Sequence, residues 1–220
     1  PVYLFSEKAA FNIKKHVPNV KIIAILRNPI ERAYSNYLHF CKVNREPCDS
    51  FLDALMDEDR RISSGWQWFW HYKKIGLYGE QIERYRSLFS DSQIKFFLHE
   101  DLNQRPEKVL EDIFSFLDID STFKPDTSYT YNKSGTPRNK KMASIINNTI
   151  RHLNSQPILK HSIKRMSSYS VRRKFIDGLR NIGLKRDNIP LDAEKHLAEY
   201  YRDDVSRLSK TINRDLSVWL

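Results

Sequence analysis

Residues 21–37 read Lys21-Ile-Ile-Ala-Ile-Leu-Arg27-Asn-Pro-Ile-Glu31-Arg-Ala-Tyr-Ser35-Asn-Tyr37, and they are the most informative part of the sequence. The apolar, largely β-branched run Ile22–Leu26 predicts a fully buried strand. Arg27 ends the strand, and Asn28-Pro29 begins a helix, since Asn is a good N-cap and proline suits the first helical position. A buried strand followed by a helix predicts an α/β fold with a parallel sheet flanked by helices.

The predicted helix has one apolar and one polar side. The apolar side comprises Ile30, Ala33, Tyr34, Tyr37, Leu38 and Cys41, and the polar side Asn28, Glu31, Arg32, Ser35, Asn36 and His39. Arg32 and Ser35 are three residues apart and therefore neighbours on the polar side. A surface helix with an ordinary solvated face explains this pattern as well as a binding site does.

The junction between strand and helix has the properties of an anion site. In open α/β sheets, ligands bind at the carboxyl ends of the strands. A helix N-terminus there offers unpaired N–H groups and the positive end of the helix dipole. Arg27 follows the strand directly and Ser35 lies about two turns into the helix, so the sequence predicts a phosphate site.

The spacing Arg27-x-Pro29-x-x-Arg32-x-x-Ser35-x-Tyr37 resembles a signature of the sulfotransferases that use 3′-phosphoadenosine-5′-phosphosulfate (PAPS), especially their bacterial and heparan-sulfate-type branch. The resemblance implies that Arg27 and Ser35 hold the 3′-phosphate of the donor. Guanidinium binds phosphate oxygens bidentately, and a hydroxyl adds one more hydrogen-bond donor.

Further stretches resemble the same family over most of the chain. They are Gly76–Tyr85 on the acceptor side, Gln93–Leu102, Pro106–Leu117, Asn132–Arg138 and Asn213–Leu220. The last of these resembles the family's usual C-terminal ending, which we expect to be a structural cap. The resemblance implies that a glycine-containing loop folds over the donor nucleotide. Its binding residues would be Ser134, Gly135, Thr136, Pro137 and Arg138.

One departure from the family pattern affects the expected fold. The family's Lys-x-Gly-Thr-[Thr/Ser] loop for the 5′-phosphosulfate is not found, and the first glycine is Gly65. We therefore expect residues 1–220 to be a single, N-terminally truncated sulfotransferase domain. It would have a P-loop-NTPase-like parallel sheet, N-terminal strands missing, and a helix-rich C-terminal half. The resemblance then places the catalytic base upstream of Pro1, and we expect weak donor binding without that segment.

Composition limits the partners of this chain. Its net charge of +10 and pI near 9.5 favour anionic ligands, and basic residues concentrate after position 138. No helix-turn-helix, zinc-finger, KH or RRM signature accompanies the charge, so nucleic acid is not expected. Histidine and cysteine spacings predict no metal site, and no apolar run reaches membrane-spanning length. The two cysteines, Cys41 and Cys48, favour free thiols and so a reducing cytoplasm. The localisation expected for a eukaryotic source is instead the Golgi lumen.

Three functions remain open at this point. The resemblance implies transfer of a sulfuryl group from PAPS to a hydroxyl or amine of an acceptor. The acceptor is a glycan, with an anionic glycan among the options, or a small molecule. An inactive basic α/β module that binds anionic polymers is one alternative. A nucleotide-kinase-like protein is another, although its Gly-x-x-x-x-Gly-Lys-[Ser/Thr] loop is not found.

The rest of the pattern predicts further elements. They are helices over Pro29–Asn44, Ser50–Arg61 and Tyr78–Phe89, a strand over Ile94–Leu98, helices from Pro106 and from Leu191, and a long polar loop over 119–137. The aromatic residues of segment 66–78 favour core over an acceptor wall, and His71 is a conceivable base. For Glu100 and Asp101, helix capping by Asp101 explains the pair as well as chemistry does.

Overall fold

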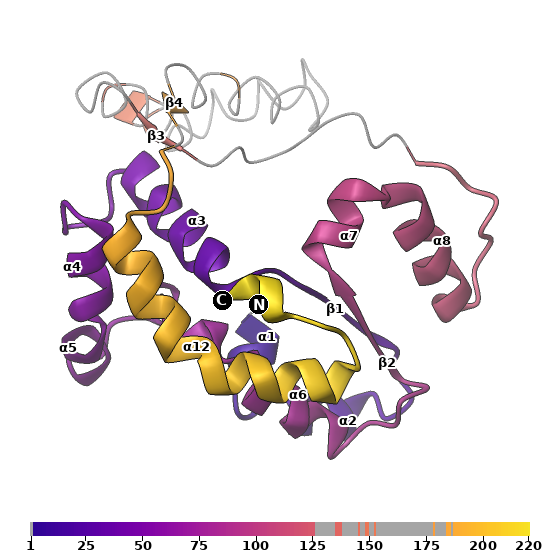
Figure 1. Cartoon of the computed structure of the whole chain (residues 1–220). Coiled ribbons are helices and arrows are strands. Elements are labelled where there is room, and N and C mark those ends of the chain that lie inside the picture. The colour runs from indigo at the N-terminus through magenta and orange to yellow at the C-terminus, as the bar shows by residue number, and fades with distance from the viewer. Residues whose placement is uncertain are drawn as a thin grey trace.

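The computed structural model describes residues 2–125, 135–137, 145, 148–149, 152, 178, 184–185 and 187–220 (Figure 1). The N-terminal half contains α1 (Val2–Phe5), α2 (Ala9–His16), β1 (Ile22–Leu26), α3 (Pro29–Lys42), α4 (Phe51–Met56), α5 (Glu58–Ser63), η1 (Trp68–Trp70), η2 (Lys74–Gly76), α6 (Tyr78–Arg86) and β2 (Ile94–Leu98). These are followed by α7 (His99–Gln104), α8 (Pro106–Leu117), β3 (Thr136–Pro137), β4 (Leu184–Lys185), α12 (Leu191–Ile212) and η3 (Ser217–Trp219).

The predicted parallel sheet is confirmed. β1 pairs with β2 in parallel, from Ile22 opposite Ile94 to Leu26 opposite Leu98. The connection between the two strands contains α3 to α6, which is the helical crossover that parallel strands require. β3 and β4 form a separate antiparallel pair.

The prediction of a fully buried first strand is wrong for most of β1. Leu26 is 2% exposed, but Ile25 is 45% exposed and Ile22 is half-buried. β1 has one strand neighbour among the described residues, so part of its apolar surface has no covering layer there. A continuous apolar run shows that both faces of a strand can be buried. Whether they are buried depends on the elements that pack against the strand.

The core lies between α3 and α12, with α4 and α6 packed around them (Figure 1). Leu197, Tyr201 and Leu208 of α12 are each fully buried. Full burial of such side chains contributes roughly 1.5–3 kcal/mol each. A smaller cluster of Ala10, Tyr85, Phe89 and Ile94 packs α2 and α6 beside the amino end of β2.

Three helix predictions need correction at their ends or middle. The helix predicted over Pro29–Asn44 ends at Lys42. The predicted helix over Ser50–Arg61 is divided at Asp57 into α4 and α5, although Ser50 is the N-cap of α4 and accepts from the Asp53 N–H at 3.0 Å. The helix predicted over Tyr78–Phe89 ends at Arg86. Of the predicted loop over 119–137, Thr136–Pro137 form β3.

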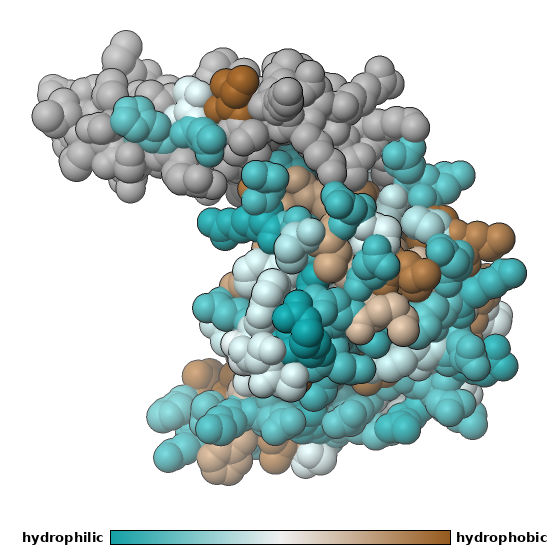
Figure 2. Space-filling model, turned by 90° about the vertical axis from the view of Figure 1, so that its left-hand side faces the viewer, coloured by the Kyte–Doolittle hydropathy of each residue, from teal (hydrophilic) through white to brown (hydrophobic). Residues whose placement is uncertain are grey.

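The molecular surface on the side of α4 and α5 is mainly hydrophilic, with apolar atoms in separate patches (Figure 2). Among the helices of the described ranges, none combines the length and apolar character needed to cross a membrane.

Candidate functional site

The candidate site lies at the carboxyl edge of β1 and β2, where α3 begins. Asn28 is the N-cap of α3, as predicted: its Oδ1 accepts from the N–H groups of Ile30 at 2.9 Å and Glu31 at 3.3 Å. Pro29 occupies the first turn, where its missing N–H costs no hydrogen bond. This local chemistry fixes the direction of α3 as it leaves the sheet.

Arg27 directly follows β1 and binds a carboxylate of α3. Its Nη2 and Nε donate to Glu31 Oε2 at 2.7 and 3.2 Å. The Arg27 side chain is 20% exposed and that of Glu31 is 46% exposed. A ligand anion at Arg27 would therefore compete with the Glu31 carboxylate for the guanidinium.

Ser35 lies on the same side of α3 as Glu31, one turn further along, and is half-buried. Gly135, a predicted site residue, is buried, and β3, formed by Thr136 and Pro137, lies against α3. The structure thus brings part of the predicted nucleotide loop to the helix that carries Ser35. Ser134 and Arg138, the other predicted loop residues, lie outside the described residues.

The predicted solvated side of α3 is in fact largely turned toward protein. Arg32 Nη2 donates to the Tyr72 carbonyl oxygen, and Asn36 Nδ2 donates to that of Phe69 at 2.8 Å. The surface-helix interpretation is wrong for these positions, because backbone carbonyls covered by a helix need donors. Arg32 therefore acts as a structural residue here.

The segment after Tyr72 is held by two buried carboxylates. Glu58 accepts from the N–H groups of Lys73 at 2.5 Å and Lys74 at 2.9 Å. Asp204 of α12 accepts from the Gly79 N–H at 2.9 Å, at the start of α6. Burial raises the pKa of both carboxyls, and these backbone N–H groups oppose the rise. Sequence reasoning missed both residues, since an acidic residue in a helix carries no sign of its partner.

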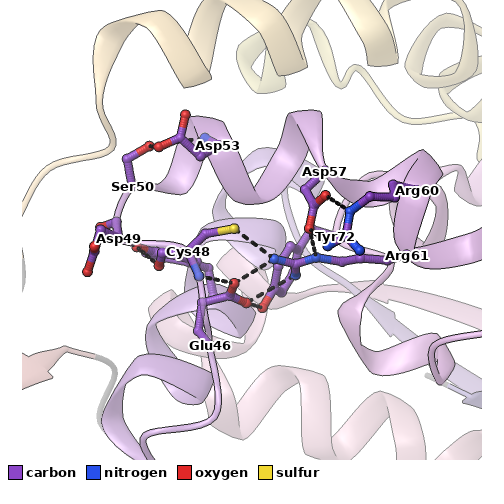
Figure 3. Close-up of polar contacts among 10 residues, drawn as sticks. Glu46, Cys48, Asp49, Ser50, Asp53, Asp57, Arg60, Arg61 and Tyr72 are labelled. Carbon is purple, nitrogen blue, oxygen red and sulfur yellow. Dashed lines mark hydrogen bonds and ion pairs between the residues drawn. The ribbon is translucent and has the colours of Figure 1, made fainter. Parts of the chain in front are cut away.

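A buried polar network supports the neighbouring segment (Figure 3). Arg61 Nη2 contacts Glu46 Oε1 at 2.6 Å, and both side chains are fully buried. Arg61 Nε also donates to Asp57 Oδ2 at 2.8 Å, and Tyr72 Oη donates to Glu46 Oε2 at 2.5 Å. The Arg61 guanidinium lies 5.1 Å from the Trp66 ring centroid. Arg61 thus joins the loop after α3 to the aromatic segment.

The aromatic segment itself has two parts. Tyr72, Ile75 and Tyr78 are buried, which confirms the core interpretation for them, whereas the residues of η1 are only half-buried. His71 Nε2 lies 3.2 Å from the Trp66 carbonyl oxygen. Burial lowers the pKa of His71, and the hydrogen bond to the Trp66 carbonyl opposes this. A role for it as a base stays a prediction.

The acidic pair after β2 binds the C-terminal segment. Asp101 accepts from Arg214 Nη2 at 3.0 Å, and Glu100 Oε1 accepts from Trp219 Nε1 at 3.1 Å. The prediction that Asp101 caps a helix is wrong, because α7 has Leu98 at its N-cap position and no side-chain cap bond.

Two further predictions concern the cysteines and the binding of a metal ion. Cys41 and Cys48 are free thiols, as predicted, and both are half-buried, although Cys41 belongs to the apolar side of α3. Cys48 Sγ accepts from Arg61 Nη2 at 3.1 Å. Within the described ranges, no group of three or more His, Cys, Asp or Glu side chains is arranged to hold a metal ion.

Comparison with known proteins places this arrangement in context. The model of the sulfotransferase domain family matches residues 9–209. The sulfotransferase of Alicyclobacillus acidocaldarius has a similar structure, with a TM-score of 0.70 and 27% identity, over 99% of this chain and 64% of that one.

Curated relatives include bifunctional heparan sulfate N-deacetylase/N-sulfotransferases. The enzyme 1 of Caenorhabditis briggsae is 26% identical over 123 residues, which is 53% of this chain and 14% of that protein. Enzyme 1 of Mus musculus is 29% identical over 133 residues, covering 54% and 14%. Enzyme 4 of Mus musculus is 28% identical over 137 residues, covering 59% and 15%. The match to the domain model spans most of the sequence, and on this ground the chain belongs to the sulfotransferase family.

Proposed function

We propose that this chain is the sulfotransferase part of an enzyme that moves a sulfuryl group from PAPS to an acceptor hydroxyl or amine. The observation that carries the proposal is Arg27 at the end of β1, beside the capped N-terminus of α3. Family membership supplies the reaction type, and PAPS is the general donor of the family.

In this proposal, Arg27 and Ser35 bind the 3′-phosphate of the donor. The guanidinium would exchange Glu31 for phosphate oxygens, which bind it bidentately. The loop 134–138 would add backbone N–H groups and the Arg138 guanidinium to the same nucleotide. These contacts lie away from the reacting sulfur, so they contribute to donor binding and not to the chemical step.

The transfer is an in-line displacement. The acceptor oxygen or nitrogen forms a bond to sulfur and gives its proton to a base, while the bond between sulfur and the bridging phosphate oxygen breaks. Adenosine 3′,5′-bisphosphate leaves with the bonding electrons. Positioning and cationic stabilisation of the developing charge supply most of the catalysis, by analogy with phosphoryl transfer.

An anionic glycan is the acceptor that we favour. The curated relatives carry heparan sulfate N-sulfotransferase in their names, and the net charge of +10 suits a polyanion. The chain covers about one seventh of the length of these relatives, so their acceptor is a proposal for this protein. The same charge favours the alternative of a binding module without activity.

The test is calorimetric titration of the full-length protein with adenosine 3′,5′-bisphosphate. The Arg27→Ala variant should bind it about 10- to 100-fold more weakly, since a hydrogen bond to a charged group is worth about 1.5–3 kcal/mol. Arg60→Ala is the matched control, because Arg60 is 62% exposed and lies on α5. Equal affinity of the Arg27→Ala variant and the wild type would refute the donor site. A glycan affinity that does not change when the nucleotide is added would favour the inactive module.

A further inference from the structure

The segment 213–220, called the C-terminal tail from here on, lies across the ends of both parallel strands. α12 ends at Ile212, and Asn213 adopts the left-handed conformation with φ +51°, which turns the chain back toward the sheet. Trp219 is 3% exposed and Leu216 is fully buried, so the tail is part of the core. Figure 1 shows the end of the tail beside the beginning of α3.

At the end of β2, the tail makes two polar contacts. Arg214 binds Asp101, and the Trp219 indole N–H binds Glu100 Oε1. The other oxygen of Glu100 is buried and has no hydrogen-bond partner among the residues that the structure describes. The indole N–H is therefore the donor that stabilises this carboxylate.

At the end of β1, the tail contacts the residue next to Arg27. Asn28 Nδ2 donates to the Trp219 carbonyl oxygen at 3.3 Å, while Asn28 Oδ1 caps α3. One amide thus connects the tail to the first turn of the helix. Trp219 consequently joins the ends of β1 and β2, through its carbonyl and its indole.

We propose that the C-terminal tail positions the donor site, and that Trp219 is a positioning residue for binding of the donor nucleotide. The inference rests on the proposed function, since it concerns the site at Arg27. Phosphate binding by a guanidinium and a helix N-terminus depends on their mutual orientation, and a preorganised site loses less entropy on binding. Release of Asn28 from the tail frees the first turn of α3.

Glu100 gives the tail a second effect on the site. Arg27 and Glu100 are both near His99: burial and Arg27 lower the pKa of His99, and Glu100 opposes this. A Glu100 carboxylate that has lost its indole partner becomes a competitor for the nearby guanidinium. Loss of the indole N–H therefore weakens phosphate binding at Arg27 without any contact between Trp219 and the ligand.

The experiment compares Trp219→Phe with Val218→Ala in the full-length protein. Phe keeps the buried ring and removes the N–H, whereas Val218 is 83% exposed and serves as the control. Adenosine 3′,5′-bisphosphate is titrated calorimetrically, and donor KM, acceptor KM and kcat are measured. We expect Trp219→Phe to raise the nucleotide Kd and the donor KM about fivefold, the value of one hydrogen bond of about 1 kcal/mol. Acceptor KM and kcat, and all values for Val218→Ala, should stay at the wild-type level.

A second variant keeps the test informative if Trp219→Phe does not fold. Asn28→Ser retains an N-cap oxygen and loses the amide donor to Trp219, so it should raise the nucleotide Kd in the same way. A lower melting temperature with an unchanged nucleotide Kd would show that the tail has only a structural role. Equal rises in donor and acceptor KM would also overturn the inference. If Arg27→Ala itself leaves binding unchanged, the donor site fails, and this result is independent of the tail variants.

Discussion

Tyr201 of α12 packs directly on Gly76 of η2. A Cβ atom built at Gly76 would lie 2.5 Å from Tyr201 Oη, and that hydroxyl donates to the Lys73 carbonyl oxygen at 2.8 Å. The residue at position 76 must therefore be glycine for reasons of space, because the ring is fixed by its own hydrogen bond. This contact attaches the start of the Gly76–Tyr85 motif to the C-terminal helix.

Replacement of Gly76 by alanine should destabilise the protein. Overpacking of a closed core costs about 1–3 kcal/mol, because the Tyr201 ring or the backbone has to move. Denaturant unfolding of Gly76→Ala and of Gly178→Ala measures the effect. Gly178 is helical and has no atom within 4 Å of its virtual Cβ, so its variant should lose no stability. Equal stabilities of both variants would contradict the packing argument.

Replacement of Glu31 by glutamine should strengthen phosphate binding at Arg27. The Glu31 carboxylate forms an ion pair with Arg27, with 2.7 Å between Oε2 and Nη2. Removal of the carboxylate charge leaves the guanidinium available to a ligand. An exposed ion pair is worth about 0.2–1 kcal/mol, so the Kd for adenosine 3′,5′-bisphosphate should fall up to about fivefold. Calorimetry at low salt is the measurement. A weaker affinity in Glu31→Gln would mean that the carboxylate itself contacts the donor.

The two arginines of α5 should differ greatly in their contribution to stability. Arg61 is fully buried between Glu46 and Asp57, and its truncation to alanine leaves a buried carboxylate unpaired, at a cost of about 3–5 kcal/mol. Arg60 binds the same Asp57 from an exposed position, where solvent screens the ion pair, so Arg60→Ala should cost far less. Urea titrations of both variants test this. Similar losses in the two variants would rule out the proposed role of burial.

Asp57 should make stability depend on pH in the acid range. Hydrogen bonds from Arg60 and Arg61 lower its pKa to about 2, from the ordinary 3.8. The folded-state pKa is depressed, so the stabilisation is complete above pH 3.8 and is lost as the pH falls toward 2. The free energy of unfolding of the wild type minus that of Asp57→Asn should shrink over this window. A difference that stays constant from pH 5 to 2 would contradict the assignment.

The elements that the sequence predicted well depend on local chemistry. The predicted bounds of β1 and β2 and the predicted start of α3 agree with the structure to the residue. Apolar runs and the Asn28-Pro29 cap act within a few positions, so local sequence is enough to place them. The pairing of Arg27 with Glu31 is not predicted by helical spacing, because Arg27 precedes the helix that carries Glu31.

The missed features depend on residues far apart in the sequence. Arg32 donates to a carbonyl 40 positions away, and Asp204 accepts from the Gly79 N–H across 125 positions. No periodicity or motif reports such a pair, because each partner looks like an ordinary polar residue of a helix or turn. For the same reason, the cap-like ending was recognised by resemblance, but its contact with Asn28 was not predicted.

The bond between Asn28 and Trp219 spans 191 positions, and this has a consequence for biosynthesis. A ribosome makes β1 and α3 early, but their junction stays unfinished until Trp219 has left the exit tunnel. Contacts of such long range slow folding, since a large loop has to close first. A chain that ends before Trp219 leaves the apolar ends of β1 and β2 exposed. Premature stop codons shortly before position 219 should therefore yield aggregates or protease substrates.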